Sequence, residues 1–385
     1  MYKYYTLLIL VLTVVKLNAQ VSVGAEQTAE YLPLLKGKNV AVVVNPTSHI
    51  KQRHLVDSLL ALGVKIKTIF APEHGFRGDQ EAGAYIKSGI DSATKLPVIS
   101  LYGSKKKPSA ADLKDVQYII FDIQDVGARF YTYISTLHYI MESCAENKLP
   151  LLVFDRPNPN GHYVDGPVLD TNFKSFVGMH PVPVVHGMTV GEYAKMINGE
   201  KWLPKGAQCQ LTVIKCKNYT HQVMYKLPIK PSPNLPTIES VYLYPSLCFF
   251  EGTDVSVGRG TNKPFESVGK PGFTKGSYEF TPVRIPGVAE TPPYMGQKCT
   301  GILLTEFGKS FMPLHNGLYL SWLVDFYKES ADKEKFFNDF FDKLAGTDQL
   351  RKQVIAGKTA DEIVESWQPA LETYKSVRKK YLLYE

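Results

Sequence analysis

The stretch Phe70–Gly83 combines side chains that can do chemistry with residues that bend the chain. It reads FAPEHGFRGDQEAG and places three acids, one histidine and one arginine among three glycines. The apolar run in front of it is typical of a buried strand, which should end before Glu73 because Pro72 cannot donate to a β-ladder. We therefore expect Glu73 and His74 at a strand mouth, where open α/β sheets bind ligands. His74 and Arg77 are expected to shape the loop or to touch the substrate. The alternative is a structural glycine turn with a capped carboxylate.

A second group of reactive side chains occurs in DIQDVGARFYTY, residues 122–133. Asp122 and Asp125 come directly after an apolar run, and Arg129 and Tyr131 follow a glycine turn. Arginine is well suited to binding a ligand carboxylate. Two structural alternatives stay open: the aspartates can cap the next helix, and Arg129 can form an ion pair with one of them.

The third group lies in FFEGTDVSVGRGTNKPF, residues 249–265, which contains Glu251 and places Arg259 between two glycines. The spacing suggests a phosphate loop, but the chain has neither GxxxxGK[ST] nor a GxGxxG after its first strand. A pocket for an anion or a sugar, lined by backbone, remains plausible here.

These carboxylates fit the needs of a glycosidase. Such an enzyme uses one carboxylic acid to protonate the leaving oxygen, and a second group that acts as nucleophile or activates water. We assign the acid role to Glu73, because an apolar strand end can raise the pKa of a carboxyl group. Asp122, Asp125 and Glu251 are its candidate partners. The nine histidines form no HExxH motif and no clear ligand triad, and no GxSxG is present, so we predict neither a metal nor a serine nucleophile.

Short apolar runs that alternate with helical patterns position these residues. Because such alternation is typical of a parallel, doubly wound sheet, the predicted fold class is α/β. Since the carboxyl ends of the strands share one edge, Asn45 and Arg156 should join Glu73 and Asp122 there. The predicted strands are Asn39–Val44, Lys65–Phe70, Pro97–Leu101, Gln117–Asp122 and Pro150–Phe154, and the predicted helices between them are Thr28–Leu35, Leu55–Leu62 and Tyr131–Asn147.

The pattern changes near residues 165–190, where prolines interrupt the alternation of strands and helices. Further on, Thr189–Asn198 reads as a helix that starts with a capping box, and Gln210–Lys215 as a strand. The segments 242–250 and 252–261 read as a glycine-rich polar stretch, and helical patterns return at 318–328, 333–344 and 361–381. We predict a first domain over residues 20–175 and a smaller mixed α/β (α+β) domain over 176–385.

The first residues, MYKYYTLLILVLTVVKLNAQ, resemble a secretory signal peptide cleaved after Ala19. Its removal takes away two lysines and no acid, so the net charge falls from +7 to +5. We therefore expect an exported protein, periplasmic or secreted, without a transmembrane segment. The charge is mild and does not demand nucleic acid as a partner. The cysteines number five and lack metal-finger spacing, so free, buried thiols are expected.

The motifs together resemble a bacterial glycoside hydrolase family, the exo-β-N-acetylmuramidases of the NamZ type. They run in order over most of the chain after residue 19: Asn45-Pro46-Thr47, PEHGFRG at 72–78, FDIQDVGARFYTY at 121–133, DRPNP at 155–159, and EGT at 251–253 through GRGT at 258–261.

The resemblance implies a Rossmann-like N-terminal domain, a smaller C-terminal domain and a cleft between them. It implies release of terminal N-acetylmuramic acid from the non-reducing end of peptidoglycan fragments, a muropeptide or disaccharide, without a cofactor. The glutamate of its PEHG motif, here Glu73, is the residue proposed as catalytic. Asp125 and Glu251 are candidate partners by position alone. The lactyl carboxylate of the sugar needs a cation, which Arg129, Arg156 or Arg259 could supply.

Two functions fit these features. The first is an exo-acting glycoside hydrolase, supported by the carboxylates, the export signal and the family resemblance. The second is a non-catalytic protein that binds peptidoglycan or sugar, since a tyrosine-rich surface suits sugar ligands equally well. A third, weaker interpretation as a nucleotide- or phosphoester-handling protein lacks the glycine fingerprints.

Overall fold

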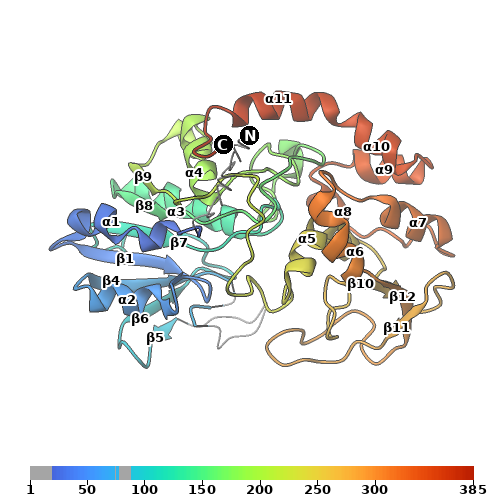
Figure 1. Cartoon of the computed structure of the whole chain (residues 1–385), viewed down its shortest axis with the longest axis horizontal. Helices are drawn as coiled ribbons and strands as arrows, with labels where there is room; N and C mark the ends of the chain where they lie inside the picture. Colours follow the sequence, from blue (N-terminus) through green and yellow to red (C-terminus); the bar gives the residue numbers. More distant parts are fainter. Residues whose placement is uncertain (1–19, 74, 78–87) are drawn as a thin grey trace, which may run out of the picture.

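The computed structural model describes residues 20–73, 75–77 and 88–385. It contains a seven-stranded sheet, a three-stranded sheet and a two-stranded sheet. The large sheet occupies one side of the molecule and the three-stranded sheet the other (Figure 1). The predicted α/β class, with a parallel sheet followed by a smaller mixed part, is confirmed.

The large sheet has the strand order β5-β6-β4-β1-β7-β8-β9, and every neighbouring pair is parallel except β5 and β6. Because β4 and β7 flank β1 on opposite sides, a topological switch point lies at the carboxyl ends of the central strands. The strands of this sheet are β1 (Asn39–Val44), β4 (Lys65–Ala71), β5 (Gly89–Ile90), β6 (Pro97–Ser100), β7 (Tyr118–Asp122), β8 (Leu151–Phe154) and β9 (Leu211–Ile214).

Helices cover both faces of this sheet, which explains why its strands read as continuous apolar runs. Val40, Val42 and Val44 of β1 pack in one core cluster with α1 (Thr28–Leu35) and α2 (Leu55–Ala61). The alternate residues Ala41 and Val43 join a second cluster with α3 (Tyr133–Asn147) and α4 (Val190–Gly199). We call the part of the chain from residue 238 onward the C-terminal half. The second cluster continues without interruption into it, so the two halves share one core.

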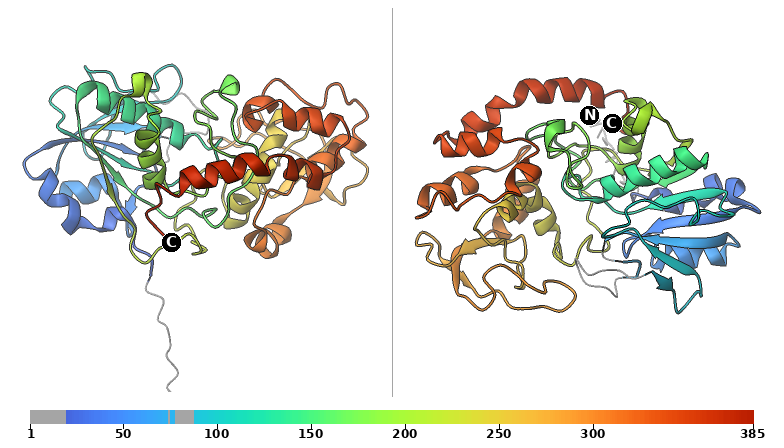
Figure 2. Two further views of the ribbon diagram at one scale, coloured as in Figure 1. Left: turned by 90° about the horizontal axis from the view of Figure 1, so that it is seen from above. Right: turned by 180° about the vertical axis from the view of Figure 1, so that it is seen from behind.

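The C-terminal half surrounds the antiparallel sheet β10-β12-β11. Figure 2 shows α11 running back from this half toward α4. Its elements are α5 (Ile238–Leu247), β10 (Ser267–Lys270), β11 (Tyr278–Phe280), β12 (Cys299–Leu303), α6 (Thr305–Ser310), α7 (Ser321–Glu329), α8 (Phe341–Ala345), α9 (Gln349–Ile355), α10 (Ala360–Ser366) and α11 (Gln368–Arg378). The small hairpin β2 (His49–Ile50) and β3 (Arg53–His54) precedes α2.

Strand β9 completes the large sheet by pairing with β8 through Leu211–Ile214. Helix α4 packs on the same two strands and begins with the predicted capping box of Thr189 and Glu192. Strand β9 and helix α4 follow the predicted boundary between residues 175 and 176, so the large sheet extends past that position.

Three segments of the C-terminal half differ from the prediction. Residues 238–247 form helix α5, which starts with a Thr237–Ser240 capping box, where a polar glycine-rich stretch was expected from residue 242. In place of the expected helix 333–344, the structure has only the short helix α8. The segment before α8 is extended, because Asp254 N donates to Phe336 O and Asn338 N donates to Gly252 O. The expected helix 361–381 breaks at Trp367 into α10 and α11.

Candidate active site

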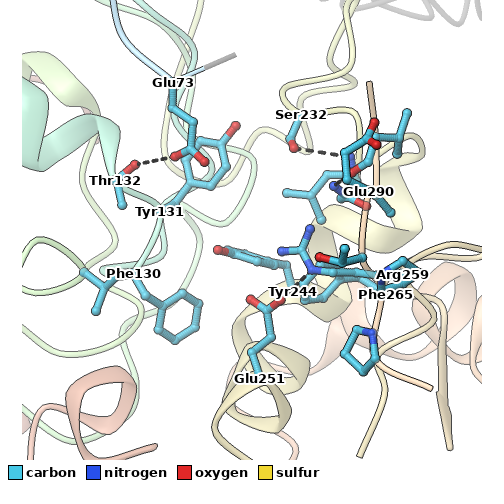
Figure 3. A pocket seen from close by; sticks show the side chains of 18 of the residues that line it. Glu73, Phe130, Tyr131, Thr132, Ser232, Tyr244, Glu251, Arg259, Phe265 and Glu290 are labelled. Atoms are coloured by element: carbon cyan, nitrogen blue, oxygen red, sulfur yellow. Dashed lines mark hydrogen bonds and ion pairs between the residues drawn. The ribbon is translucent and has the colours of Figure 1, made fainter. Parts of the chain in front are cut away.

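A pocket of about 490 Å³ lies between the carboxyl edge of the large sheet and the C-terminal half. Both halves line it, and its walls carry three carboxylates together with several aromatic rings (Figure 3). The lining residues are Glu73, Phe130, Tyr131, Thr132, Tyr133, Val177, Ser232, Asn234, Leu235, Tyr244, Glu251, Arg259, Phe265, Val288, Ala289, Glu290, Thr291, Pro292 and Pro293.

Glu73 enters the pocket from the end of β4. The strand ends at Ala71, and Pro72 separates it from Glu73. Thr132 Oγ1 donates to Glu73 Oε2 at 3.3 Å, and the Tyr133 hydroxyl donates to the backbone oxygen of Glu73 at 3.3 Å. Burial, followed by the nearby Glu73 carboxylate, raises the pKa of Tyr102 to about 12. Glu73 is thus held among hydroxyl groups with its carboxylate facing the pocket (Figure 3).

The opposite wall carries the ion pair between Glu251 and Arg259. Arg259 Nε donates to Glu251 Oε1 at 2.5 Å, and the guanidinium lies 5.1 Å from the centre of the Phe265 ring. Gly258 and Gly260 have φ angles of +74° and +79°. A Cβ at Gly258 would meet Lys263 O at 2.6 Å, and one at Gly260 would meet Val283 O at 2.6 Å. The two glycines therefore let the loop close around Arg259 in a way that other residues would obstruct.

Several lining residues were not among the predicted site residues. Glu290 adds a third carboxylate, whose Oε2 accepts from Arg284 Nε at 2.6 Å. Ser232 faces it, and Tyr244 lies against Phe265 with ring centres 5.0 Å apart (Figure 3). The segment around Glu290 has no motif and no regular element, so only its position in the folded chain reveals it.

Asp125 is buried and is not among the lining residues. Its Oδ1 accepts from Gly127 N at 2.7 Å, whereas its Oδ2 has no hydrogen-bond partner within the described parts of the chain. Burial raises the pKa of this carboxyl group to about 7. His186 Nε2 lies 3.9 Å from Oδ1. Since Met188 N donates to the other ring nitrogen, the neutral His186 ring carries its proton toward Asp125.

Asp122 and Arg156 form an ion pair inside the protein. Arg156 donates from Nε to Asp122 Oδ1 at 2.6 Å and from its terminal nitrogen to Oδ2 at 2.8 Å. The same terminal nitrogen donates to His49 O at 2.9 Å. Both side chains are buried and neither lines the pocket. The pair joins the ends of β7 and β8, and we assign it to the fold instead of the predicted substrate binding.

Arg129, also predicted to bind substrate, is fully buried away from the pocket lining. One terminal nitrogen donates to Pro167 O and Val182 O, both at 2.8 Å. The other donates to Leu344 O at 3.0 Å and Ala345 O at 2.6 Å. These bonds tie the large-sheet half to the end of α8, so Arg129 holds the two halves together.

Of the remaining predicted residues that the structure describes, Tyr131 lines the pocket, whereas Asn45 and Arg77 do not. Tyr131 lines the pocket and donates from its hydroxyl to Pro231 O at 2.6 Å. Asn45 is buried outside the lining, with its side-chain oxygen accepting from Thr47 N. Arg77 pairs with Asp57 of α2 and with Asp91, and it is not among the lining residues. His74 lies outside the described residues.

Other kinds of site find no support in the described ranges. No group of three or more histidine, cysteine or acidic side chains there could hold a metal ion. The five cysteines are free and buried, as expected. Among the helices of these ranges, none is long and apolar enough to cross a membrane.

Comparison with known proteins identifies the family. The family model described as "Exo-beta-N-acetylmuramidase NamZ, N-terminal" matches residues 40–239, and its C-terminal counterpart matches residues 242–384. The chain belongs to the NamZ family. It is therefore a glycoside hydrolase, and the family resemblance drawn from the motifs is confirmed.

Relatives of the NamZ family cover nearly the whole chain. The "Peptidoglycan beta-N-acetylmuramidase NamZ" of Bacillus subtilis (strain 168) is 40% identical over 375 residues, which span 92% of this chain and 89% of that protein. Two crystal structures of DUF1343 family proteins from Bacteroides fragilis NCTC 9343 superpose with TM-scores of 0.89 and 0.79, at 48% and 28% identity. Each match covers 95% of this chain and 99% of the other.

Proposed function

We propose that this NamZ-family enzyme removes terminal N-acetylmuramic acid from the non-reducing end of peptidoglycan fragments, with Glu73 as the general acid. The observation that carries the proposal is a single pocket in which Glu73 faces a wall with a second carboxylate, Glu251. Two carboxyl groups across one sugar-sized pocket are what hydrolysis of a glycosidic bond requires. The B. subtilis relative, named as a peptidoglycan β-N-acetylmuramidase, supports the choice of substrate.

In the proposed reaction Glu73 gives its proton to the glycosidic oxygen while the bond from that oxygen to the anomeric carbon breaks. Glu251 either attacks this carbon and forms a glycosyl ester, which water then hydrolyses, or removes a proton from the water that attacks it. In the first case Glu73 takes its proton back from that water; in the second Glu251 releases the proton to solvent and Glu73 regains one from solvent. The products are free N-acetylmuramic acid and a saccharide shortened by one residue, and no cofactor enters the balance.

Glu251 fits the second role better than the other carboxylates do. Its carboxylate lines the pocket, and the 2.5 Å hydrogen bond from Arg259 Nε to Oε1 fixes its position on the wall. Asp125, the other predicted partner, is buried outside the lining, so direct contact with the anomeric carbon would require the wall to move. Glu290 lies on the wall but pairs with Arg284, whose side chain is 61% exposed.

We further propose that residues 1–19 direct export, which would place the enzyme where peptidoglycan fragments occur. The apolar run Leu7–Val15, which follows Lys3, supports this proposal. N-terminal sequencing of the protein from fractionated cells tests it. A mature chain that begins at Gln20 outside the cytoplasm is expected, whereas a full-length cytoplasmic chain would refute it.

The function is tested by incubating the protein without residues 1–19 with the disaccharide MurNAc-β-1,4-GlcNAc and analysing the mixture by mass spectrometry. We expect free MurNAc and GlcNAc to appear. Saturable binding of the disaccharide with no product release would instead favour the sugar-binding alternative.

The role of Glu251 is tested by substitution. Glu251→Gln should lower kcat by at least ~10²-fold, and the matched control Glu290→Gln should lower kcat less. If Glu290→Gln lowered kcat more than Glu251→Gln did, Glu290 would be assigned the second catalytic role in place of Glu251.

A further inference from the structure

The pocket contains a single cationic side chain among its described lining residues, Arg259. The same lining contains three carboxylates, Glu73, Glu251 and Glu290. Glu251 and Glu290 would repel the carboxylate of an acidic sugar in this pocket unless a cation offset their charge. Arg129 and Arg156, the two other arginines considered for a sugar carboxylate, have their guanidinium groups bonded inside the fold.

Arg259 is held by one edge of its guanidinium group only. Nε donates to Glu251 Oε1 at 2.5 Å, and the flat face of the group lies against Phe265. For the terminal nitrogens, no hydrogen bond to the described chain occurs, and Figure 3 shows them directed into the pocket. The Glu251 carboxylate outweighs the effect of burial and raises the pKa of Arg259, so the group stays charged. A planar guanidinium group can bind one carboxylate along each of two edges.

We propose that the terminal nitrogens of Arg259 bind the lactyl carboxylate of the substrate and so select N-acetylmuramic acid over neutral N-acetylhexosamines. The inference rests on the proposed function and assigns specificity within the same pocket. One guanidinium group would then contact both Glu251 and the substituent that distinguishes muramic acid from glucosamine. Arg259 is a specificity residue in this account, and its contact with Glu251 is a separate, positioning role.

The test compares three aryl β-glycosides that differ only at the 3-O position: that of MurNAc, its lactyl methyl ester, and that of GlcNAc. The ester keeps the shape of the lactyl group and removes its charge. The wild-type enzyme should prefer the free acid to the ester in kcat/KM by about 10- to 100-fold, the range for a charge-assisted hydrogen bond. If the wild type hydrolyses acid and ester equally well, the proposal is overturned without any variant.

Variants then show which residue causes the preference. Arg259→Gln should reduce the ratio of kcat/KM for the free acid to kcat/KM for the ester to near 1. If the substitution acted only by removing the contact with Glu251, all three glycosides would be hydrolysed more slowly by the same factor and this ratio would not change. Arg259→Lys should keep part of the ratio. Arg53→Gln, the same change at an exposed arginine of β3 outside the lining, should leave it unchanged. An unchanged ratio in Arg259→Gln overturns the proposal, and a wild type that cleaves none of the glycosides refutes the proposed function instead.

Discussion

The polar residues at the strand ends serve two different purposes. Glu73 faces the pocket, where it can meet a substrate. Asp122 and Asp125, at the end of β7, turn inward and are buried. The pKa of Asp125 is raised to about 7 by burial, so this carboxyl group is more easily protonated in the folded protein than in the unfolded chain.

Asp125 gives a prediction about pH and stability. The unfolded chain ionises Asp125 near 3.8, whereas the folded protein does so only near 7. Its contribution to the free energy of unfolding is therefore fully present below 3.8 and is lost as pH rises to about 7. Asp125→Asn should remove this dependence. Urea titrations of both proteins at several pH values would measure it, and parallel profiles would contradict the raised pKa.

Arg129 gives a second prediction at this scale. Its replacement by methionine leaves four buried backbone oxygens without their donor. We expect Arg129→Met to lower the free energy of unfolding by ~3 kcal/mol or more, as measured by urea titration. Arg284→Met, at an exposed site, should change it by less than ~0.5 kcal/mol. Unchanged stability together with weaker substrate binding would instead indicate that Arg129 binds the substrate, as the sequence predicted.

At the level of elements, the C-terminal tail is anchored to the carboxyl end of β8. The Tyr384 hydroxyl donates to Asp155 Oδ2 at 2.6 Å and accepts from Cys216 N at 2.9 Å. Asp155 also accepts from Thr189 Oγ1 and Gly191 N at the start of α4. The tail that follows α11 thereby connects the C-terminal half to the large sheet.

Removing one hydroxyl group tests this anchor. Tyr384→Phe leaves the buried Asp155 carboxylate and the Cys216 amide with one partner fewer, so we expect a loss of ~1–3 kcal/mol in the free energy of unfolding. Tyr381→Phe is the matched control, because its hydroxyl bonds the partly exposed Glu200 at 2.6 Å. Thermal unfolding of the two variants would give the comparison, and equal losses would argue against the anchor.

Elements whose signals are local were predictable from the sequence. Helix α1 and strand β1 have the predicted bounds, and α4 has the predicted capping box. The segment 333–344 was not predictable, because Phe336 is drawn into the core and its backbone pairs with Asp254 across more than 80 positions of sequence. A contact with such a distant segment outweighed the local helical pattern.

The site was predictable only in part, for the same reason. Glu73, Tyr131, Glu251 and Arg259 line the pocket. Arg129 turns inward because it bonds carbonyl groups up to 216 positions away in the sequence. No local sequence pattern reveals such distant partners. The position of Glu290 depends likewise on how the two halves meet.

At the scale of the whole molecule, the pocket exists only because the two halves pack together. The large sheet supplies Glu73, and the C-terminal half supplies Glu251 and Arg259. One continuous core passes between the halves, so the distance across the pocket is fixed by packing and not by a linker. A general acid from one half and a second carboxylate from the other can then act on one bound sugar.

The most direct test of this account asks whether Glu73 protonates the leaving group. Glu73→Gln should lower kcat/KM for MurNAc-β-1,4-GlcNAc by ~10²–10⁴-fold, because its sugar leaving group needs a proton. The same variant should lose far less on the 2,4-dinitrophenyl glycoside of MurNAc, whose leaving group departs without one. Near-wild-type turnover of the disaccharide, or an equal loss on both substrates, would contradict the assignment of Glu73 as the general acid.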